Sequence, residues 1–225
     1  MEIPKKLKVI ADPVHGPILY TTIEHEILSS RVFNRLHNIL QNSMAYYVYP
    51  STRTSRFVHS IGVMHLATVM FTNGCLNADP DDLTEFLEEL YSEFKEVLRK
   101  VNIKNKIDEK ILDKIGFQRS APFRERLQRL NEDDTLKIVG KRLQEERVLR
   151  NFALPLSESL LPIYYVSLQS LRLLGLLHDC GHLPFSHVME FALESLWDKL
   201  EEKTGLNELE ENVRVILDNY CSVKE

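Results

Sequence analysis

Apolar residues recur at three- and four-residue steps along most of the chain, and this spacing is typical of helices that bury one face. The segment from Thr22 to about Met44 has this pattern, and so does "RFVHSIGVMHLATVMF" at 56–71. Residues 7–20, "LKVIADPVHGPILY", instead form two short apolar runs separated by Pro and Gly, the pattern of a β-hairpin. The "YYVYP" at 46–50 is expected to be a short extended piece. We therefore predict an all-α protein with a small N-terminal β-hairpin.

The second half of the chain has the same helical character. The segment 161–179, "LPIYYVSLQSLRLLGLLHD", is apolar nearly all round, as expected of a helix buried in a core. Gly181 is expected to end this helix in a left-handed conformation, and Pro184 to prevent its continuation. Two further helices are predicted over 185–203 and 207–220.

The middle of the chain is dense in charge. All charged residues of 79–94 are acidic, whereas Lys and Arg outnumber Asp and Glu in 95–150. We interpret 76–160 as a charged helical insertion that forms a lobe or binds a partner; the alternative is a set of solvated helix faces. This divides the chain into residues 1–75, the insertion and residues 161–225.

Composition excludes several classes of protein. The 225 residues are 44% hydrophobic, which is enough for a core, and a net charge of −5 gives no bias toward nucleic acid or anionic membranes. Cys75, Cys180 and Cys221 are far apart and form no CxxC pair, so neither a disulfide scaffold nor a Cys-rich zinc site is indicated. No apolar run is long enough to cross a membrane, and the first residues do not look like a signal peptide. We expect a cytoplasmic protein.

The candidate chemistry lies in "LLGLLHDCGHLPFSH" at 173–187, where a leucine-rich helix ends in His178 and Asp179. Two ligands in the last turn of a helix can flank a cation beyond its end, and the helix dipole attracts that cation. Imidazole nitrogen with carboxylate oxygen suits Zn, Mn, Fe or Ni. His59 is the best third ligand, and Gly62 on the same helix face is expected to let another helix approach. The alternative is a buried, hydrogen-bonded cluster.

These motifs resemble the HD-domain phosphohydrolases, in particular the deoxynucleoside triphosphate triphosphohydrolases. The resemblance covers roughly 7–72 and 165–197 and includes "DPVHGPI", "VFNRLHNILQNSMAYYVYP", "TRTSRFVHSIGVMHLA" and "LLHDCGHLPFSH". It implies an HD-domain helical core and a metal held by His59, His178 and Asp179.

The resemblance also implies roles around this metal. Arg56 and His182 would contact the phosphates of the substrate, His187 would be the acid/base or water-positioning residue, and Gln41 would read the sugar edge. Each residue has a plainer alternative: helix capping for the two histidines, a salt bridge for Arg56 and an ordinary amide for Gln41.

The chain departs from the family pattern in two places. The family has a fourth ligand, an Asp about a hundred residues beyond the His-Asp pair, and Asp218 is too early to match it. The family's His-Glu pair after the PFSH helix has no counterpart in "KTGLNELEEN". We therefore expect either a piece of a longer enzyme or an incomplete variant.

The resemblance implies a metal-dependent phosphohydrolase that converts (deoxy)nucleoside triphosphates to nucleoside and triphosphate. The alternatives are an HD phosphodiesterase or nuclease and a non-catalytic binding or regulatory subunit. The cofactor would be a divalent transition metal: Mn, Fe, Zn or Ni. A nucleotide substrate, a homo-oligomer and a protein partner for 79–160 are expected. A nucleic-acid partner is compatible with the sequence but not indicated by it.

Overall fold

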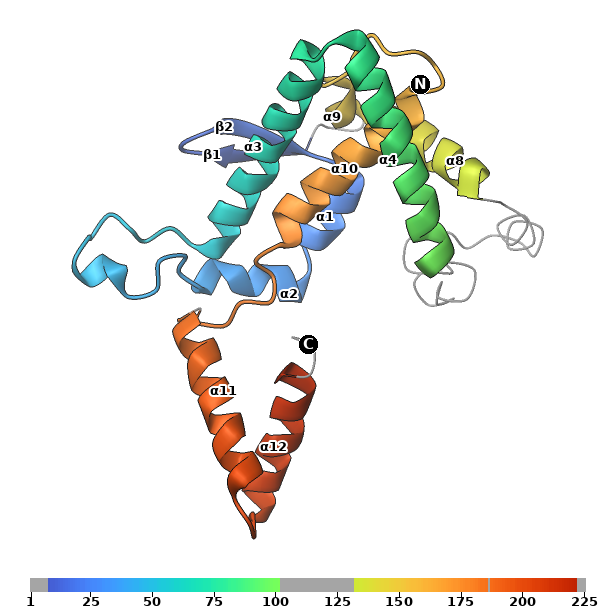
Figure 1. The fold of residues 1–225 in the computed structure, drawn as a ribbon. Helices are drawn as coiled ribbons and strands as arrows, with labels where there is room; N and C mark the ends of the chain where they lie inside the picture. Colours follow the sequence, from blue (N-terminus) through green and yellow to red (C-terminus); the bar gives the residue numbers. More distant parts are fainter. Residues whose placement is uncertain (1–7, 102–131, 186, 222–225) are drawn as a thin grey trace, which may run out of the picture. The chain divides into compact units, whose positions relative to one another are not determined.

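The protein is mainly helical and has one β-hairpin near its N-terminus (Figure 1). The structure is a computed structural model that describes residues 8–101, 132–185 and 187–221; the side chains at 101, 187 and 219–221 lie outside this description. The predicted fold class, helical with a small N-terminal hairpin, is confirmed.

The hairpin pairs β1 (Lys8–Asp12) with β2 (Gly16–Tyr20) in antiparallel register. Its turn is organised by Asp12, whose Oδ1 accepts hydrogen bonds from the backbone N–H groups of Val14 at 2.9 Å and His15 at 2.7 Å. Gly16 takes a φ of 75°, a conformation that a residue without Cβ adopts at little cost.

The helical pattern predicted from Thr22 to about Met44 corresponds to three short helices, and it does not extend beyond Asn38. These are α1 (Thr22–Leu28), α2 (Arg31–Asn34) and the 3-10 helix η1 (Arg35–Asn38). Ser30 begins α2 as its N-cap: its hydroxyl accepts a hydrogen bond from the N–H of Phe33 at 3.2 Å. Beyond η1, Ile39 is extended, and Leu40 forms an isolated β-bridge with Ser55.

The "YYVYP" segment also differs from its prediction. Part of it lies in a second 3-10 helix, η2 (Ala45–Tyr47), rather than in an extended piece. Tyr46 and Tyr47 stack with ring centroids 4.4 Å apart, and the Arg53 guanidinium lies 4.8 Å from the centre of the Tyr46 ring. Local aromatic packing therefore favours the compact turn.

Two long helices carry the two halves of the predicted site, α3 (Arg56–Asn77) and α10 (Leu161–Leu177). They approach closely at Gly175, where an added Cβ would lie 2.9 Å from Met64 Cα. Gly62 does not have the predicted role, because a Cβ there would meet the His15 ring at 3.3 Å and not another helix. The glycine that permits close packing of the two helices is thus on α10.

The charged middle of the chain is helical wherever the structure describes it. It forms α4 (Pro80–Val101), α8 (Glu132–Gln144) and α9 (Arg147–Arg150); the part of the prediction on 102–131 lies outside the described residues. Its apolar faces share a core with α10, built around Leu87, Leu136, Leu149, Ile163 and Leu168.

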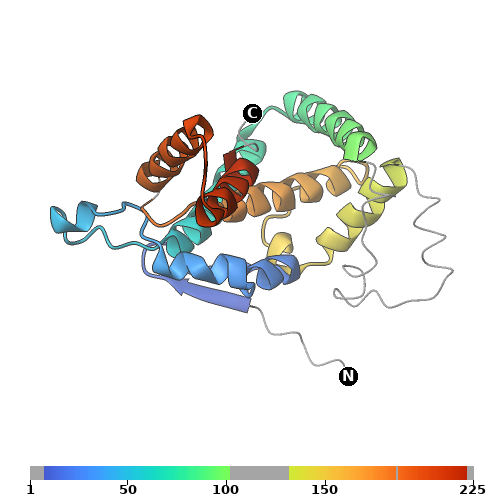
Figure 2. The same cartoon turned by 90° about the horizontal axis from the view of Figure 1, so that it is seen from below.

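The chain divides into two compact units, residues Met1–Ile27 with Ile61–Leu176 and residues Leu28–Ser60 with Leu177–Glu225. The second unit ends in α11 (His187–Glu202) and α12 (Glu208–Cys221), which lie side by side (Figures 1 and 2). No helix in the described part of the chain is long and apolar enough to cross a membrane.

The end of α10 corrects one expectation. Gly181 does not have the left-handed conformation expected of a helix cap; in the described residues only Gly16 and Gly205 among glycines have a positive φ. Instead α10 ends at Leu177, and Cys180 N–H donates back to the carbonyl of Leu177 at 3.0 Å.

Candidate metal centre

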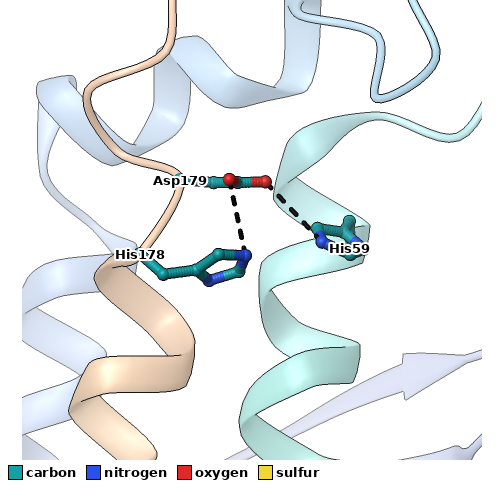
Figure 3. Close-up of side chains that lie close together, drawn as sticks. All are labelled: His59, His178 and Asp179. Carbon is teal, nitrogen blue, oxygen red and sulfur yellow. Dashed lines mark ion pairs between the residues drawn. The ribbon is translucent and has the colours of Figure 1, made fainter.

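Three side chains predicted to bind metal converge within the unit formed by residues 28–60 and 177–225 (Figure 3). His59 projects from the first turn of α3, which begins at Arg56. His178 and Asp179 follow directly on the last residue of α10. A helix start and a helix end therefore bring together residues more than a hundred positions apart in the sequence.

The spacing of the donor atoms fits a shared cation. His59 Nε2 lies 3.6 Å from Asp179 Oδ2, His178 Nε2 lies 3.4 Å from Asp179 Oδ1, and the three donor atoms all lie within 4.8 Å of one another. Ligands about 2.1 Å from a metal are separated by about 3.4 Å at the tetrahedral angle. The observed separations are close to this value, so small adjustments suffice for these residues to hold an ion.

The surroundings of Asp179 favour a cation. Only 7% of the Asp179 side chain is exposed, and Arg56 Nη1 lies 2.5 Å from its Oδ2. That oxygen is buried and accepts no hydrogen bond of good geometry from any described residue. Arg56 offsets the charge of this buried carboxylate but leaves acceptor capacity unused, so the carboxylate can also bind a cation.

The two histidines present suitable donors. Burial lowers the pKa of His59, outweighing the opposite effect of Asp179, and so favours the neutral imidazole that metals bind. The side chains of His59 and His178 are each 33% exposed, which leaves the cluster accessible from solvent. The donor set, two imidazoles and one carboxylate, suits Zn, Mn, Fe or Ni.

Arg56 lies beside the cluster rather than apart from it. Its side chain is 4% exposed, and its backbone N–H donates to the Ile39 carbonyl at 2.8 Å. The contact with Asp179 is the salt bridge that the plainer interpretation expected. Its role in contacting phosphate stays a prediction.

His182 reaches the cluster from the loop after α10. Its Nε2 lies 3.5 Å from Asp179 Oδ1, and its Nδ1 lies 2.9 Å from Glu190 Oε1. If Nδ1 carries the proton, it donates to Glu190 and turns Nε2 toward the cluster as an acceptor. Glu190 was not among the residues predicted from the sequence, because its contact with His182 depends on how the loop turns before α11.

The other predicted residues are not brought into the cluster by a described contact. His187 is the first residue of α11, and its side chain lies outside the described part of the structure. Gln41 donates its backbone N–H to the Thr54 carbonyl at 2.9 Å. Asp218, considered and set aside as a fourth ligand, accepts a hydrogen bond from Trp197 Nε1 at 2.7 Å.

Comparison with known proteins finds local relatives of this chain. It is 42% identical to the uncharacterized protein MJ1154 of Methanocaldococcus jannaschii over 73 residues, 32% of this chain and 16% of that protein. It is 42% identical to deoxynucleoside triphosphate triphosphohydrolase SAMHD1 of Bos taurus over 65 residues, which are 29% of this chain and 11% of that protein. With SAMHD1 of Homo sapiens the identity is 41% over 70 residues, which are 31% of this chain and 10% of that protein.

These similarities are confined to a part of each protein. The matches cover no more than about a sixth of the length of these relatives. No family model matches the chain. A crystal structure of a hypothetical protein from Aquifex aeolicus aligns over 96% of this chain and 66% of its own, with 18% identity and a TM-score of 0.29, too low to indicate a shared fold.

Proposed function

We propose that this chain carries the metal centre of an HD-type hydrolase that acts on (deoxy)nucleoside triphosphates and releases nucleoside and inorganic triphosphate. The observation that carries the proposal is the convergence of His59, His178 and Asp179, in a chain with local similarity to SAMHD1 triphosphohydrolases. The region of similarity is short, so the substrate class is part of the proposal.

The three residues suit a divalent transition ion, as their spacing and donor types indicate. Such an ion, when bound, polarises a phosphoryl oxygen and lowers the pKa of a water molecule beside it. The buried Asp179 would supply a carboxylate ligand, and His59 and His178 would supply imidazole ligands; burial lowers the pKa of His59 and so favours its neutral form. Mn, Fe, Zn and Ni all fit this description.

The chain's own residues would bind and orient the triphosphate. A guanidinium has five N–H donors, so the contact of Arg56 with Asp179 is compatible with a further contact to phosphate. With both ring nitrogens protonated, His182 would donate through Nδ1 to Glu190 and through Nε2 to a phosphate oxygen beside the cluster. Gln41 would contact the sugar.

The proposed reaction breaks one ester bond. Water attacks the α-phosphorus, the bond from that phosphorus to the nucleoside oxygen breaks, and the departing oxygen takes a proton. His187 would supply or direct that proton, which such residues do at a gain of about 10²–10⁴-fold in rate. The products are the nucleoside and inorganic triphosphate.

The test is incubation of the protein, loaded with Mn²⁺ or Fe²⁺, with each dNTP and separation of the products by chromatography. Release of inorganic triphosphate is the expected result. Asp179→Asn should abolish it, whereas Asp198→Asn, at an exposed position of the same unit, should leave it unchanged. Release of phosphate or pyrophosphate would indicate another phosphohydrolase, and turnover of a phosphodiester or nucleic acid would indicate a phosphodiesterase or nuclease.

The remaining alternatives and predictions concern binding, assembly and location. A metal-loaded protein that binds nucleotide without turnover would favour the non-catalytic binding subunit. Homo-oligomer formation, a protein partner for 79–160 and a cytoplasmic location stay predictions.

A further inference from the structure

The loop that follows α10 carries two of the three clustered residues and the predicted phosphate contact. It bears His178, Asp179 and His182 within five positions. Its described backbone hydrogen bonds include Cys180 N–H to the Leu177 carbonyl at 3.0 Å and His182 N–H to the Asp179 carbonyl at 3.2 Å. Carbonyl groups of a loop take no part in the hydrogen bonds of the preceding helix and need other donors, such as side chains or water.

Strain adds to this need. Phe185, near the end of the same loop, has a φ of 67°, a left-handed conformation that costs a bulky residue energy. Such a conformation persists only where surrounding contacts hold it. Contacts from another element would therefore stabilise the loop.

Arg35 supplies such contacts. Its Nη1 donates to the carbonyl of His182 at 2.9 Å, and its Nη2 donates to the carbonyl of Cys180. The planar guanidinium thus contacts two carbonyls on either side of Gly181, immediately after Asp179. Both hydrogen bonds have a charged donor, so each is stronger than a neutral one.

The position of Arg35 is itself well fixed. It begins η1 between Phe33, 1% exposed, and Leu36, fully buried. Its backbone N–H donates to the carbonyl of Arg31, and Ser30 caps the preceding turn. Arg35 therefore reaches the loop from a firmly packed turn of the same unit.

We infer that Arg35 is a positioning residue that fixes the 178–182 loop so that Asp179 and His182 face the metal cluster. It acts through the backbone and is neither a ligand nor a group that contacts substrate. A flexible loop would have to be ordered when metal binds, which lowers affinity. This inference rests on the proposed metal centre.

The test compares Arg35→Ala and Arg35→Lys with Arg31→Ala, which removes an exposed arginine from the neighbouring turn. The first measurement, without metal, is amide hydrogen exchange of peptides covering 178–185. Exchange should be faster in Arg35→Ala, intermediate in Arg35→Lys, and unchanged in Arg31→Ala. Lysine keeps the charge but lacks the fork that reaches two carbonyls at once.

The second measurement is Mn²⁺ affinity by titration, at a temperature where circular dichroism shows each variant folded. Loss of an outer-shell contact typically lowers metal affinity about 10- to 100-fold. We expect a loss of this order in Arg35→Ala, a smaller loss in Arg35→Lys and none in Arg31→Ala. A loss of stability alone would leave the affinity of the folded protein unchanged. If Arg35→Ala does not fold, Arg35→Lys decides both measurements.

The outcomes separate this inference from the proposed function. Unchanged exchange of the loop overturns the anchoring role of Arg35. Faster exchange with unchanged Mn²⁺ affinity overturns its role in positioning the ligands. No Mn²⁺ binding by the unaltered protein overturns both the proposed metal centre and ligand positioning, and exchange then decides the anchoring alone.

Discussion

The Asp179 carboxylate lies in a nearly closed environment, with Arg56 Nη1 2.5 Å from its Oδ2. Removing one partner of a buried ion pair leaves the other charge poorly compensated, which typically costs about 3–5 kcal/mol. Arg56→Ala should therefore lower the free energy of unfolding by about 3 kcal/mol in urea titrations. Arg214→Ala, which removes an exposed pair with Glu211, should change it by less than about 1 kcal/mol.

The same variant gives a second readout for the metal centre. If a cation binds Asp179, it should compensate the charge that Arg56→Ala leaves behind. Added Mn²⁺ should then stabilise Arg56→Ala more than it stabilises the unaltered protein. An equal or smaller effect of Mn²⁺ on the variant would contradict this prediction.

A second buried ion pair lies in the other unit and serves its stability. Arg172 and Glu24 are 1% and 0% exposed at their side chains and are joined through Arg172 Nε at 2.7 Å and Nη2 at 2.8 Å. Thr68 Oγ1 accepts from Arg172 Nη1 at 3.0 Å, and the Leu19 carbonyl accepts from Nη2 at 2.9 Å. The pair thus connects the hairpin, α1, α3 and α10.

Breaking this second pair should be severe. Glu24→Gln removes the charge that compensates the guanidinium, so we expect a loss of about 3 kcal/mol or more in the free energy of unfolding. Thr68→Val removes two hydrogen bonds, one accepted from Arg172 Nη1 and one donated to the Met64 carbonyl, and should cost about 1–2 kcal/mol. Chemical denaturation should show a larger loss in the free energy of unfolding for Glu24→Gln than for Thr68→Val. Equal losses would contradict the prediction that the ion pair contributes most.

At the scale of elements, α3 and α10 are held at close range by a glycine. Gly175→Ala would place a Cβ 2.9 Å from Met64 Cα and 3.0 Å from its backbone N, so the helices must move apart. Overpacking of this kind typically costs about 1–3 kcal/mol. Gly74→Ala on α3 meets no atom within 4 Å and should instead stabilise its helix by about 0.5–1 kcal/mol. Thermal unfolding of both variants should show shifts of opposite sign.

The sequence pattern predicted the helices and strands better than the places where they end or pack against one another. The hairpin and the long apolar helix were predictable, because their spacing and turn residues are local signals. At Ser30 one helix ends and the next begins, because the serine hydroxyl caps α2. The apolar spacing continues across this break, so the sequence pattern does not reveal it. Gly62 and Gly175 are both helical glycines, and only packing reveals which one faces a helix.

The candidate site could be predicted to a similar extent. The convergence of His59 with His178 and Asp179 followed from the motif, and the structure brings these residues together. The contact of Glu190 with His182 depends on how the loop turns before α11, which no periodicity encodes. The same holds for Arg35, because it donates to two backbone carbonyls. Every residue has a backbone carbonyl, so the residue types at these positions do not indicate the contact.

At the scale of the whole molecule, the cluster lies in the unit of residues 28–60 and 177–225, and the charged middle of the chain belongs to the other. Along the sequence, the boundaries of the units fall within α3 and before the last residue of α10. A metal ion should therefore stabilise most directly the unit that binds it. Hydrogen exchange can measure this, because it reports protection segment by segment.

Metal binding should raise the stability of the folded protein in a manner that depends on the ion. A ligand that binds only the native state at 100 times its Kd adds about 2.7 kcal/mol. We therefore expect Mn²⁺ or Zn²⁺ to raise the unfolding temperature by several degrees and to slow amide exchange most in peptides near His59 and His178. Ca²⁺, which prefers sites of six or more oxygen ligands, should have little effect. Asp179→Asn should abolish the response, whereas Asp198→Asn should retain it. A shift of equal size with Ca²⁺, or one that persists in Asp179→Asn, would show that the ions bind elsewhere on the protein.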